Sequence, residues 1–278
     1  MYIMSIDLES WLHRPVFHVP LEKQTKAEDD GFIPRAVELL LEELDRFKAK
    51  ATFFCLGSVA EWYPESIEAI GAQGHELAVH GYTHRPLHEE SRATFEDEVK
   101  RTLSLLTQHG QRPIGFRAPT FSRAPFVYEV LENNAFRYDS SVMPIRTPLY
   151  DWSMYSGSTP FWATPSILEI PLSVYKVPLL GRVPVGGTYF RLLGGLVDTR
   201  LLERVEQTCG VAVFYIHPWE LLPERHVRLP LAKRALAYYR IPALRAFEKV
   251  LGSFAWTDFR DSLDALTQRL VRATPGNG

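Results

Sequence analysis

The stretch Glu76-Leu77-Ala78-Val79-His80-Gly81-Tyr82-Thr83-His84 begins as a short apolar strand and ends with two histidines four residues apart. If the backbone makes a helical turn after the strand, His80 and His84 lie on the same face, and both imidazoles can bind one cation. Two nearby histidines are often ordinary surface or capping residues. The pair therefore indicates a metal site only if further ligands meet it in space.

The start of the chain supplies candidate ligands of a second kind. Residues 2–7 form an apolar run typical of a buried strand, and Asp7 and Glu9 follow at its end. Residues two apart in a strand point to the same face, so both carboxylates share one side. If this strand ends beside the histidine turn, two nitrogens and one carboxylate oxygen surround one point, with the second carboxylate beside it. Three protein ligands with an open position are typical of a catalytic zinc site.

Strand and helix patterns alternate through the first half of the chain. We expect strands at 2–7, 51–56, 76–79 and 114–116, and helices at 33–48, 64–74, 91–109 and 124–133. This alternation is typical of a parallel sheet with crossover helices, either open or closed into a barrel. Polar residues follow the ends of the presumed strands, namely Asp7, His80, Arg117 and Asp139. In such folds the active site lies at the carboxyl ends of the strands.

The second half contains a less regular part. Residues 143–198 are rich in proline, glycine and aromatic side chains, and we expect them to form loops and small strands inserted on the barrel rim. A helix at 199–209 and a strand at 211–216, which ends at His217, resume the alternation. Two further helices are expected at 230–250 and 258–272. We therefore predict one domain over residues 1–272 and a frayed tail at 273–278.

Composition limits the class of protein. The chain has 278 residues, of which 46% are hydrophobic and 23% are charged, values that are ordinary for a globular protein with a large core. The formal net charge of −2 gives no electrostatic case for nucleic-acid binding. Basic residues gather after residue 220 in an amphipathic pattern that allows weak affinity for an anionic or membrane surface. The two cysteines, Cys55 and Cys209, imply no disulfide framework.

The first residues, Met-Tyr-Ile-Met-Ser-Ile-Asp, do not have the basic and apolar regions of a secretory signal. We also find no apolar run long enough to span a bilayer. The expected location is cytoplasmic, with peripheral attachment to the inner membrane as an alternative. The sequence leaves the oligomeric state open.

Taken singly, the remaining polar candidates have ordinary interpretations. Arg117 would be a surface arginine, Asp139 the cap of a turn, and His217 a buried core histidine. Together, five stretches in their order along the chain resemble the NodB-homology polysaccharide deacetylases, carbohydrate esterase family 4. They look especially like the exosortase-associated branch of exopolysaccharide loci. The five stretches are Lys50-Ala51-Thr52-Phe53-Phe54-Cys55-Leu56-Gly57, residues 74–84, Tyr138-Asp139-Ser140-Ser141-Val142, Tyr189-Phe190-Arg191-Leu192-Leu193 and Tyr215-Ile216-His217-Pro218-Trp219-Glu220.

The resemblance implies an α/β fold, a distorted (β/α)7 barrel with a metal at its carboxyl mouth. It also implies a role for each candidate. His80, His84 and Glu9 would bind the metal, Asp7 would be the general base, Arg117 would hold the base, Asp139 would orient the catalytic histidine, His217 would be the general acid, and the backbone N–H near Thr120 would be the oxyanion donor. Tyr82 and Trp219 are candidate aromatic walls for a sugar ring, with Trp152, Trp162 and Tyr189. The implied metal is Zn²⁺, with Co²⁺, Ni²⁺, Mn²⁺ and Fe²⁺ as alternatives.

One departure from the family pattern matters. Most members have two adjacent aspartates at the first motif, whereas Leu8 separates Asp7 from Glu9 here. Which carboxylate binds the metal and which acts as base therefore stays open. A similar separated pair occurs in relatives that act on intracellular or small cyclic-amide substrates.

The implied function is metal-dependent removal of N-acetyl groups from an N-acetylhexosamine-containing saccharide, with a lipid-linked exopolysaccharide precursor as a candidate substrate. One alternative is hydrolysis of a small cyclic amide or imide of the allantoin type. Another is non-catalytic carbohydrate binding on an inherited barrel.

Overall fold

A curled sheet of nine strands forms the centre of the computed structural model, which describes residues 1–146, 151–155, 157–177, 181–222 and 243–273. The strands are β1 (Tyr2–Leu8), β2 (Thr52–Cys55), β3 (Glu76–Val79), β4 (Gly115–Phe116), β5 (Tyr138–Asp139), β6 (Phe161–Trp162), β7 (Leu168–Glu169), β10 (Ala212–Ile216) and β11 (Trp256–Thr257). Seven strands run parallel in the order β10-β1-β2-β3-β4-β5-β7, β6 pairs antiparallel with β7, and β11 pairs parallel with β1. A separate hairpin joins β8 (Val174–Val177) to β9 (Gly181–Pro184). This arrangement confirms the α/β class and the distorted (β/α)7 barrel.

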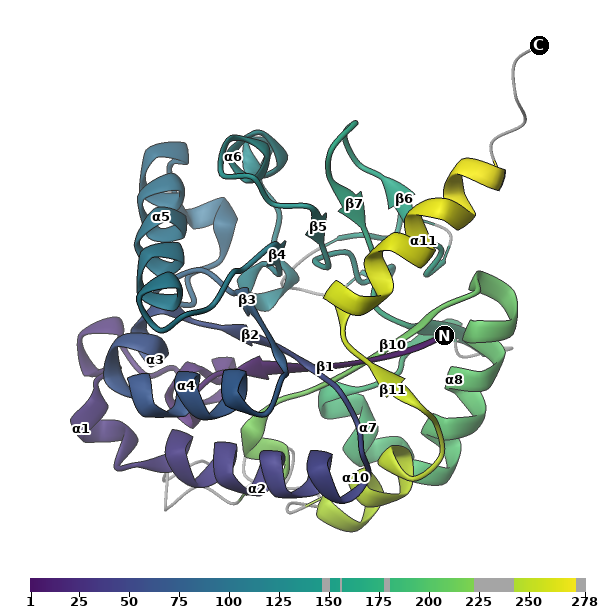
Figure 1. Ribbon diagram of the computed structural model, residues 1–278, viewed down its shortest axis with the longest axis horizontal. Helices are drawn as coiled ribbons and strands as arrows, with labels where there is room; N and C mark the ends of the chain where they lie inside the picture. Colours follow the sequence, from purple (N-terminus) through teal and green to yellow (C-terminus); the bar gives the residue numbers. More distant parts are fainter. Residues whose placement is uncertain (147–150, 156, 178–180, 223–242, 274–278) are drawn as a thin grey trace.

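Helices pack around this sheet, and β1 crosses the centre of the view in Figure 1 beside β10 and β2. They are α1 (Lys26–Asp29), α2 (Phe32–Arg46), α3 (Gly57–Trp62), α4 (Pro64–Ala72), α5 (Arg92–Gln108), α6 (Val127–Asn133), α7 (Gly187–Leu193), α8 (Gly195–Cys209), α10 (Leu244–Leu251) and α11 (Phe259–Ala273). Short 3-10 turns include η1 (Trp11–His13), η5 (Pro119–Phe121) and η6 (Pro218–Glu220). Among the residues with described positions, no helix is long and apolar enough to cross a membrane.

The side chains of β1 alternate between two layers. Met4, Ile6 and Leu8 point outward into the large core beneath the helices. Ile3 points into a second, smaller core inside the curl of the sheet, where α11 packs. Because side chains alternate along a strand, Asp7 shares the inner face with Ile3. The interior is thus apolar near the amino ends of the strands and polar near their carboxyl ends.

Several elements differ from the sequence predictions. β7 pairs with β5 in the main sheet, so the region 143–198 is not wholly a rim insertion. The helices α3 and α7 were not predicted, because six or seven residues show little periodicity and their stability comes from tertiary packing. The helix predicted at 230–250 is confirmed only for α10, since 223–242 lie outside the described residues. Of the basic cluster at 225–249, Arg245 and Lys249 lie on α10, and the other residues lie outside the described residues. The predicted tail at 273–278 also lies outside them except for Ala273, which ends α11.

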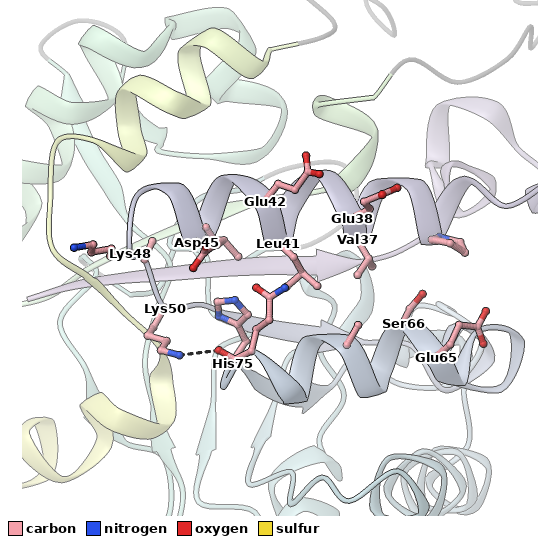
Figure 2. A pocket seen from close by; sticks show the side chains of 15 residues that line it. Val37, Glu38, Leu41, Glu42, Asp45, Lys48, Lys50, Glu65, Ser66 and His75 are labelled. Atoms are coloured by element: carbon pink, nitrogen blue, oxygen red, sulfur yellow. Dashed lines mark hydrogen bonds between the residues drawn. The ribbon is translucent and has the colours of Figure 1, made fainter.

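A cavity of about 800 Å³ lies between α2 and α4 (Figure 2). It is lined by charged residues such as Glu38, Glu42 and Lys50, and by His75. Burial, with a further contribution from Lys50, lowers the pKa of His75 to about 4. Lys50 and His75 precede β2 and β3, so this cavity lies toward the amino ends of the strands. None of the residues predicted to form the active site lines it.

Glu76→Gln is expected to reduce the pH dependence of stability. Glu76 is 1% exposed at the amino end of β3, and burial raises its pKa to about 7, against about 4.3 in an unfolded chain. Between these two pKa values the folded state keeps the proton that the unfolded state has lost. The free energy of unfolding therefore falls as the pH rises from about 4.3 to about 7. The full loss is about 4 kcal/mol, and most of it falls between pH 5 and pH 8. Urea unfolding at pH 5 and pH 8 measures it, and the same pH dependence in both proteins would contradict the prediction.

Candidate active site

A cavity of about 230 Å³ opens at the carboxyl ends of β1 and β10. Its lining combines residues from five separate parts of the chain, among them Asp7, Glu9, His84, Thr120, His217 and Trp219. The sequence analysis singled out all six. The crossover topology explains their convergence, because the carboxyl ends of parallel strands meet at one edge of the sheet.

Glu9, His80 and His84 converge on one point. Glu9 Oε1 lies 2.9 Å from His80 Nε2 and 3.0 Å from His84 Nε2. His80 Nδ1 lies 2.8 Å from the carbonyl oxygen of Arg117, a contact in which Nδ1–H donates and the Nε2 lone pair faces Glu9. A lone pair aimed at a carboxylate oxygen is unfavourable unless a proton or a cation lies between them. Tetrahedral zinc ligands lie about 3.3 Å from one another, so this donor set fits a zinc ion.

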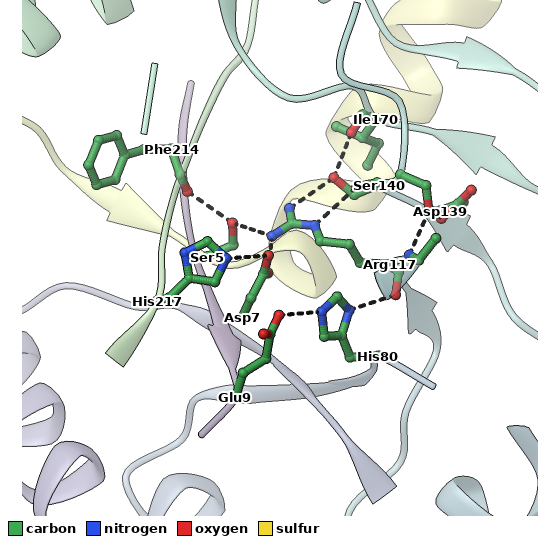
Figure 3. Close-up of polar contacts among 12 residues, drawn as sticks. Ser5, Asp7, Glu9, His80, Arg117, Asp139, Ser140, Ile170, Phe214 and His217 are labelled. Atoms are coloured by element: carbon green, nitrogen blue, oxygen red, sulfur yellow. Dashed lines mark hydrogen bonds and ion pairs between the residues drawn. The ribbon is translucent and has the colours of Figure 1, made fainter. Parts of the chain in front are cut away.

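The two carboxylates of the first motif have different neighbours. Glu9 faces the histidine pair, whereas Arg117 Nη1 donates to Asp7 Oδ1 at 2.5 Å (Figure 3). Asp7 also belongs, with Glu9 and His217, to a second group whose candidate ligand atoms lie within 4.8 Å of one another. The arrangement favours Glu9 as the metal ligand and leaves Asp7 beside the proposed metal position.

Arg117 is fully buried, and its donors are directed to fixed acceptors. Besides Asp7, Nη1 donates to Ser5 Oγ at 3.0 Å, Nε donates to the Ser140 carbonyl at 3.0 Å, and Nη2 donates to Ser140 Oγ at 3.1 Å. The guanidinium also lies 4.0 Å from the centre of the Phe54 ring. With so many contacts, Arg117 can hold the Asp7 carboxylate in one orientation.

His217 lies across the cavity from the histidine pair, immediately after β10. Its Nε2 is 3.8 Å from Asp7 Oδ2, and its ring stacks on Trp219 with centroids 4.3 Å apart. Burial lowers the pKa of His217, but the Glu220, Glu9 and Asp7 carboxylates outweigh this effect and raise the pKa above its usual value. The imidazole is therefore suited to carry a proton near neutral pH.

The turn that carries His84 is not the helical turn expected from the spacing. Gly81 has φ 79° and His84 has φ 58°, both left-handed. Glu98 on α5 holds this turn by accepting hydrogen bonds from Tyr82 N at 3.0 Å, Thr83 N at 3.3 Å and Thr83 Oγ1 at 2.7 Å. The position of His84 thus depends on a carboxylate that the sequence analysis did not identify.

Glu98→Ala is expected to weaken zinc binding about 10- to 100-fold, the range for residues that orient metal ligands. Without its carboxylate, the turn loses the acceptor for three donors, and His84 is no longer held toward Glu9. A competition titration with a chromophoric chelator measures the affinity. The matched control is Glu96→Ala on the same helix, which removes only an exposed pair with Lys100. Equal zinc affinities of the two variants would contradict the prediction.

Thr120 lies on a strained turn at the cavity wall. Thr120 and Phe121 have φ 54° and φ 55°, a left-handed conformation that is rare for residues other than glycine. Such strain is concentrated at functional sites. The side-chain oxygen of Thr120 is buried and has no partner among the described residues. This location is compatible with the oxyanion role that the resemblance implies for the nearby backbone N–H.

Two predicted site residues lie elsewhere. The Tyr82 hydroxyl donates to Glu61, and the Arg101 guanidinium lies 3.9 Å from the centre of the Tyr82 ring, so this side chain packs between α3 and α5 and is no wall of the cavity. Asp139 lies on the far side of Arg117 from His217 (Figure 3). It accepts a hydrogen bond from Ser141 Oγ at 2.5 Å. Among the described residues, no hydrogen bond or ion pair joins Asp139 to His217, so this structure does not show the predicted orienting role.

The sequence analysis also missed residues of the site. Arg14 and Arg191 line the cavity, and the buried His13 ring lies 5.7 Å from that of His84. Arg14 and His13 could have been predicted as site residues because they belong to the loop that follows β1, and long loops at this edge of the sheet are often functional. Glu220 lies three residues after His217, and this spacing could have indicated that the two side chains meet. Of the proposed aromatic walls, Trp219 alone is among the described residues that line the cavity.

Known proteins resemble this chain in two segments. Residues 28–138 match the polysaccharide deacetylase family, and residues 140–264 match a domain of unknown function, DUF3473. Peptidoglycan deacetylase-like protein FGM2 of Gibberella zeae is 33% identical over 150 residues, which are 50% of this chain and 44% of that protein. The peptidoglycan deacetylase of Helicobacter pylori is 29% identical over 155 residues, 52% of each chain. The chain spans about half the length of the curated relatives it matches.

Solved structures extend the likeness to the whole fold. A Mycobacterium smegmatis protein assigned as a polysaccharide deacetylase has a TM-score of 0.66 at 21% identity, covering 99% of this chain and 91% of that chain. PuuE allantoinase has a TM-score of 0.62 at 16% identity with the same coverage. At such identities these structures support the fold alone. The sequence match over residues 28–138 identifies that part of the chain as a polysaccharide deacetylase domain, also known as the NodB-homology or carbohydrate esterase 4 domain.

Proposed function

We propose that this protein is a metal-dependent amidohydrolase that removes acetyl groups from N-acetylhexosamine units of a saccharide. The observation that carries the proposal is the convergence of Glu9, His80 and His84 beside the Asp7–Arg117 pair and His217 around one cavity. Named deacetylases among the relatives support the same reaction class. We further propose Zn²⁺ as the metal and an exopolysaccharide precursor, in lipid-linked form, as the substrate.

The residues around the cavity can divide the work of amide hydrolysis. A bound zinc ion would acidify water and polarise the amide carbonyl. Asp7, fixed by Arg117, would accept the proton of the attacking water through Oδ2, the oxygen that faces His217. His217 would donate a proton to the departing amine, which an acetamide needs because its amide nitrogen leaves poorly when unprotonated. The Thr120 turn would offer its N–H to the oxyanion.

The test is acetate release from N-acetylglucosamine oligomers by the purified, zinc-loaded chain. The expected result is release that disappears in His217→Ala while the zinc content is unchanged. Full zinc occupancy with no acetate from any N-acetylated saccharide would overturn the proposal and favour carbohydrate binding without catalysis.

A second candidate keeps the chemistry and changes the substrate. The separation of Asp7 and Glu9 by Leu8 motivates a small cyclic amide or imide, because the resemblance places such a separated pair in relatives that act on these substrates. Allantoin assayed in parallel with the oligomers distinguishes the two substrates. Hydrolysis of allantoin alone would support the second candidate.

A further inference from the structure

A buried carboxylate lies directly beside the His217 ring. Glu220 follows His217 by three residues in η6 and is 0% exposed. Glu220 Oε1 lies 3.8 Å from His217 Nδ1, and Glu220 Oε2 accepts a hydrogen bond from the His217 backbone N–H at 3.4 Å. Both Oε1 and Nδ1 are buried and have no hydrogen-bond partner among the described residues. Buried polar atoms are nearly always paired, and a shift of about 1 Å lets Nδ1 donate to Oε1. Oε1 has two lone pairs and also lies 3.8 Å from Arg191 Nε, so it can accept from both groups.

The remaining contacts of the ring leave Nδ1 to Glu220. Nε2 faces Asp7 Oδ2 at 3.8 Å, and Trp219 covers one face of the ring at an interplanar angle of 13°. Asp139, the residue for which the resemblance implies the orienting role, is on the other side of Arg117 (Figure 3). The ring thus lies between two carboxylates, one at each nitrogen.

The charged groups around His217 come from several elements. Asp7 and Glu9 stand at the end of β1, and Glu220 belongs to η6. Arg191 of α7 places Nε 3.8 Å from Glu220 Oε1. Asp198 of α8 is fully buried near Glu220, and burial raises its pKa to about 8, so this carboxyl group is mostly neutral near pH 7. Glu220 is consequently the carboxylate that acts on the Nδ1 edge of the ring.

We propose that Glu220 is the positioning residue of His217: it accepts a hydrogen bond from Nδ1–H and directs Nε2 toward Asp7 and the cavity. This assignment replaces the one implied for Asp139. A carboxylate that fixes the tautomer of a histidine is a recurrent device in catalytic and metal sites. The inference depends on the proposed function only for calling His217 a proton donor, since the tautomer can be measured without any activity.

The first experiment is nitrogen-15 NMR of the zinc-loaded protein, with the His217 signals assigned by comparison with His217→Ala. At a pH where the ring is neutral, we expect Nδ1 to carry the proton in the wild type. In Glu220→Met, which keeps the approximate size of the side chain and removes the acceptor, this preference should disappear. If the methionine variant does not fold, Glu220→Gln, which keeps one acceptor oxygen, replaces it. The measured quantity is then the pH midpoint of His217 titration, which we expect to be lower than in the wild type.

Asp139→Asn is the matched control, because it also changes a buried carboxyl group in this region and should leave the His217 tautomer unchanged. Where the wild type releases acetate, Glu220→Gln is expected to lower kcat about 10- to 100-fold with little change in KM. An unchanged tautomer in Glu220→Met, or an unchanged pH midpoint in Glu220→Gln, overturns the proposal. A wild type that hydrolyses nothing overturns the proposed function alone, because the NMR result still decides the role of Glu220.

Discussion

Replacing His80 with alanine is expected to abolish tight zinc binding and to lower acetate release by more than about 1000-fold. His80 Nε2 is one of three candidate donor atoms, with His84 Nε2 and Glu9 Oε1. The contact of His80 Nδ1 with the Arg117 carbonyl fixes the direction of Nε2. Two donors cannot form the three-ligand site typical of catalytic zinc. Losing the zinc would remove both water activation and carbonyl polarisation, and carbonyl polarisation alone is worth several kcal/mol, or roughly 1000-fold in rate.

The measurements are the zinc content after dialysis and the rate of acetate release. His88→Ala is the matched control, because the His88 side chain is 53% exposed and lies close to the same turn. It should keep both zinc and activity. Treatment of the wild type with a chelator should reproduce the loss, and added zinc should reverse it. Wild-type zinc content in His80→Ala, or activity that survives complete removal of metal, would contradict the prediction.

Part of this site could be predicted from the sequence because it follows from strand geometry. Asp7 lies on the inner face of β1 by simple alternation, and Glu9, two residues on, lines the same cavity. The alternation of strands and helices likewise predicted the parallel sheet and the edge where the polar residues meet. These inferences need only local periodicity and the direction of the strands.

The side chains whose direction depends on distant partners could not be predicted in the same way. Contacts with Glu61 on α3 and Arg101 on α5 set the direction of the Tyr82 side chain, although Tyr82 lies between the two histidines in the sequence. Asp139 lies at the end of β5, as expected, but its carboxyl group accepts a hydrogen bond from Ser141 and has none with His217 among the described residues. The sequence shows which residues follow a strand; it does not show which neighbour their polar atoms will contact.

Local backbone conformation was a second limit. The spacing of His80 and His84 suggested a helical turn, yet the chain uses the left-handed Gly81 and His84 conformations and the Glu98 contacts. Histidine at positive φ is uncommon, so a pattern of residue types gives little sign of it. The predicted ligand pair was nevertheless brought together, because more than one turn geometry can bring two imidazoles to the same point.

Replacing Arg117 with methionine is expected to lower the free energy of unfolding by about 3–5 kcal/mol, the usual effect of removing one partner of a buried ion pair. The side chains of Arg117 and Asp7 are 0% and 2% exposed, so the variant leaves a carboxylate in the interior without its cation. It also leaves the Ser140 carbonyl without the Nε donor. Urea unfolding at pH 7 measures the change.

Arg137→Met is the matched control, since it makes the same substitution in a pair with Asp264 whose side chains are 54% and 80% exposed. That variant should lose no more than about 1 kcal/mol. Adding Asp7→Asn to Arg117→Met should recover part of the loss, because the uncompensated charge is then removed while the cavity left by the arginine remains. Equal losses in Arg117→Met and Arg137→Met would contradict the prediction. Recovery in the double variant would show that the stability of the interior depends on the same Asp7 charge that the proposed reaction uses as its base.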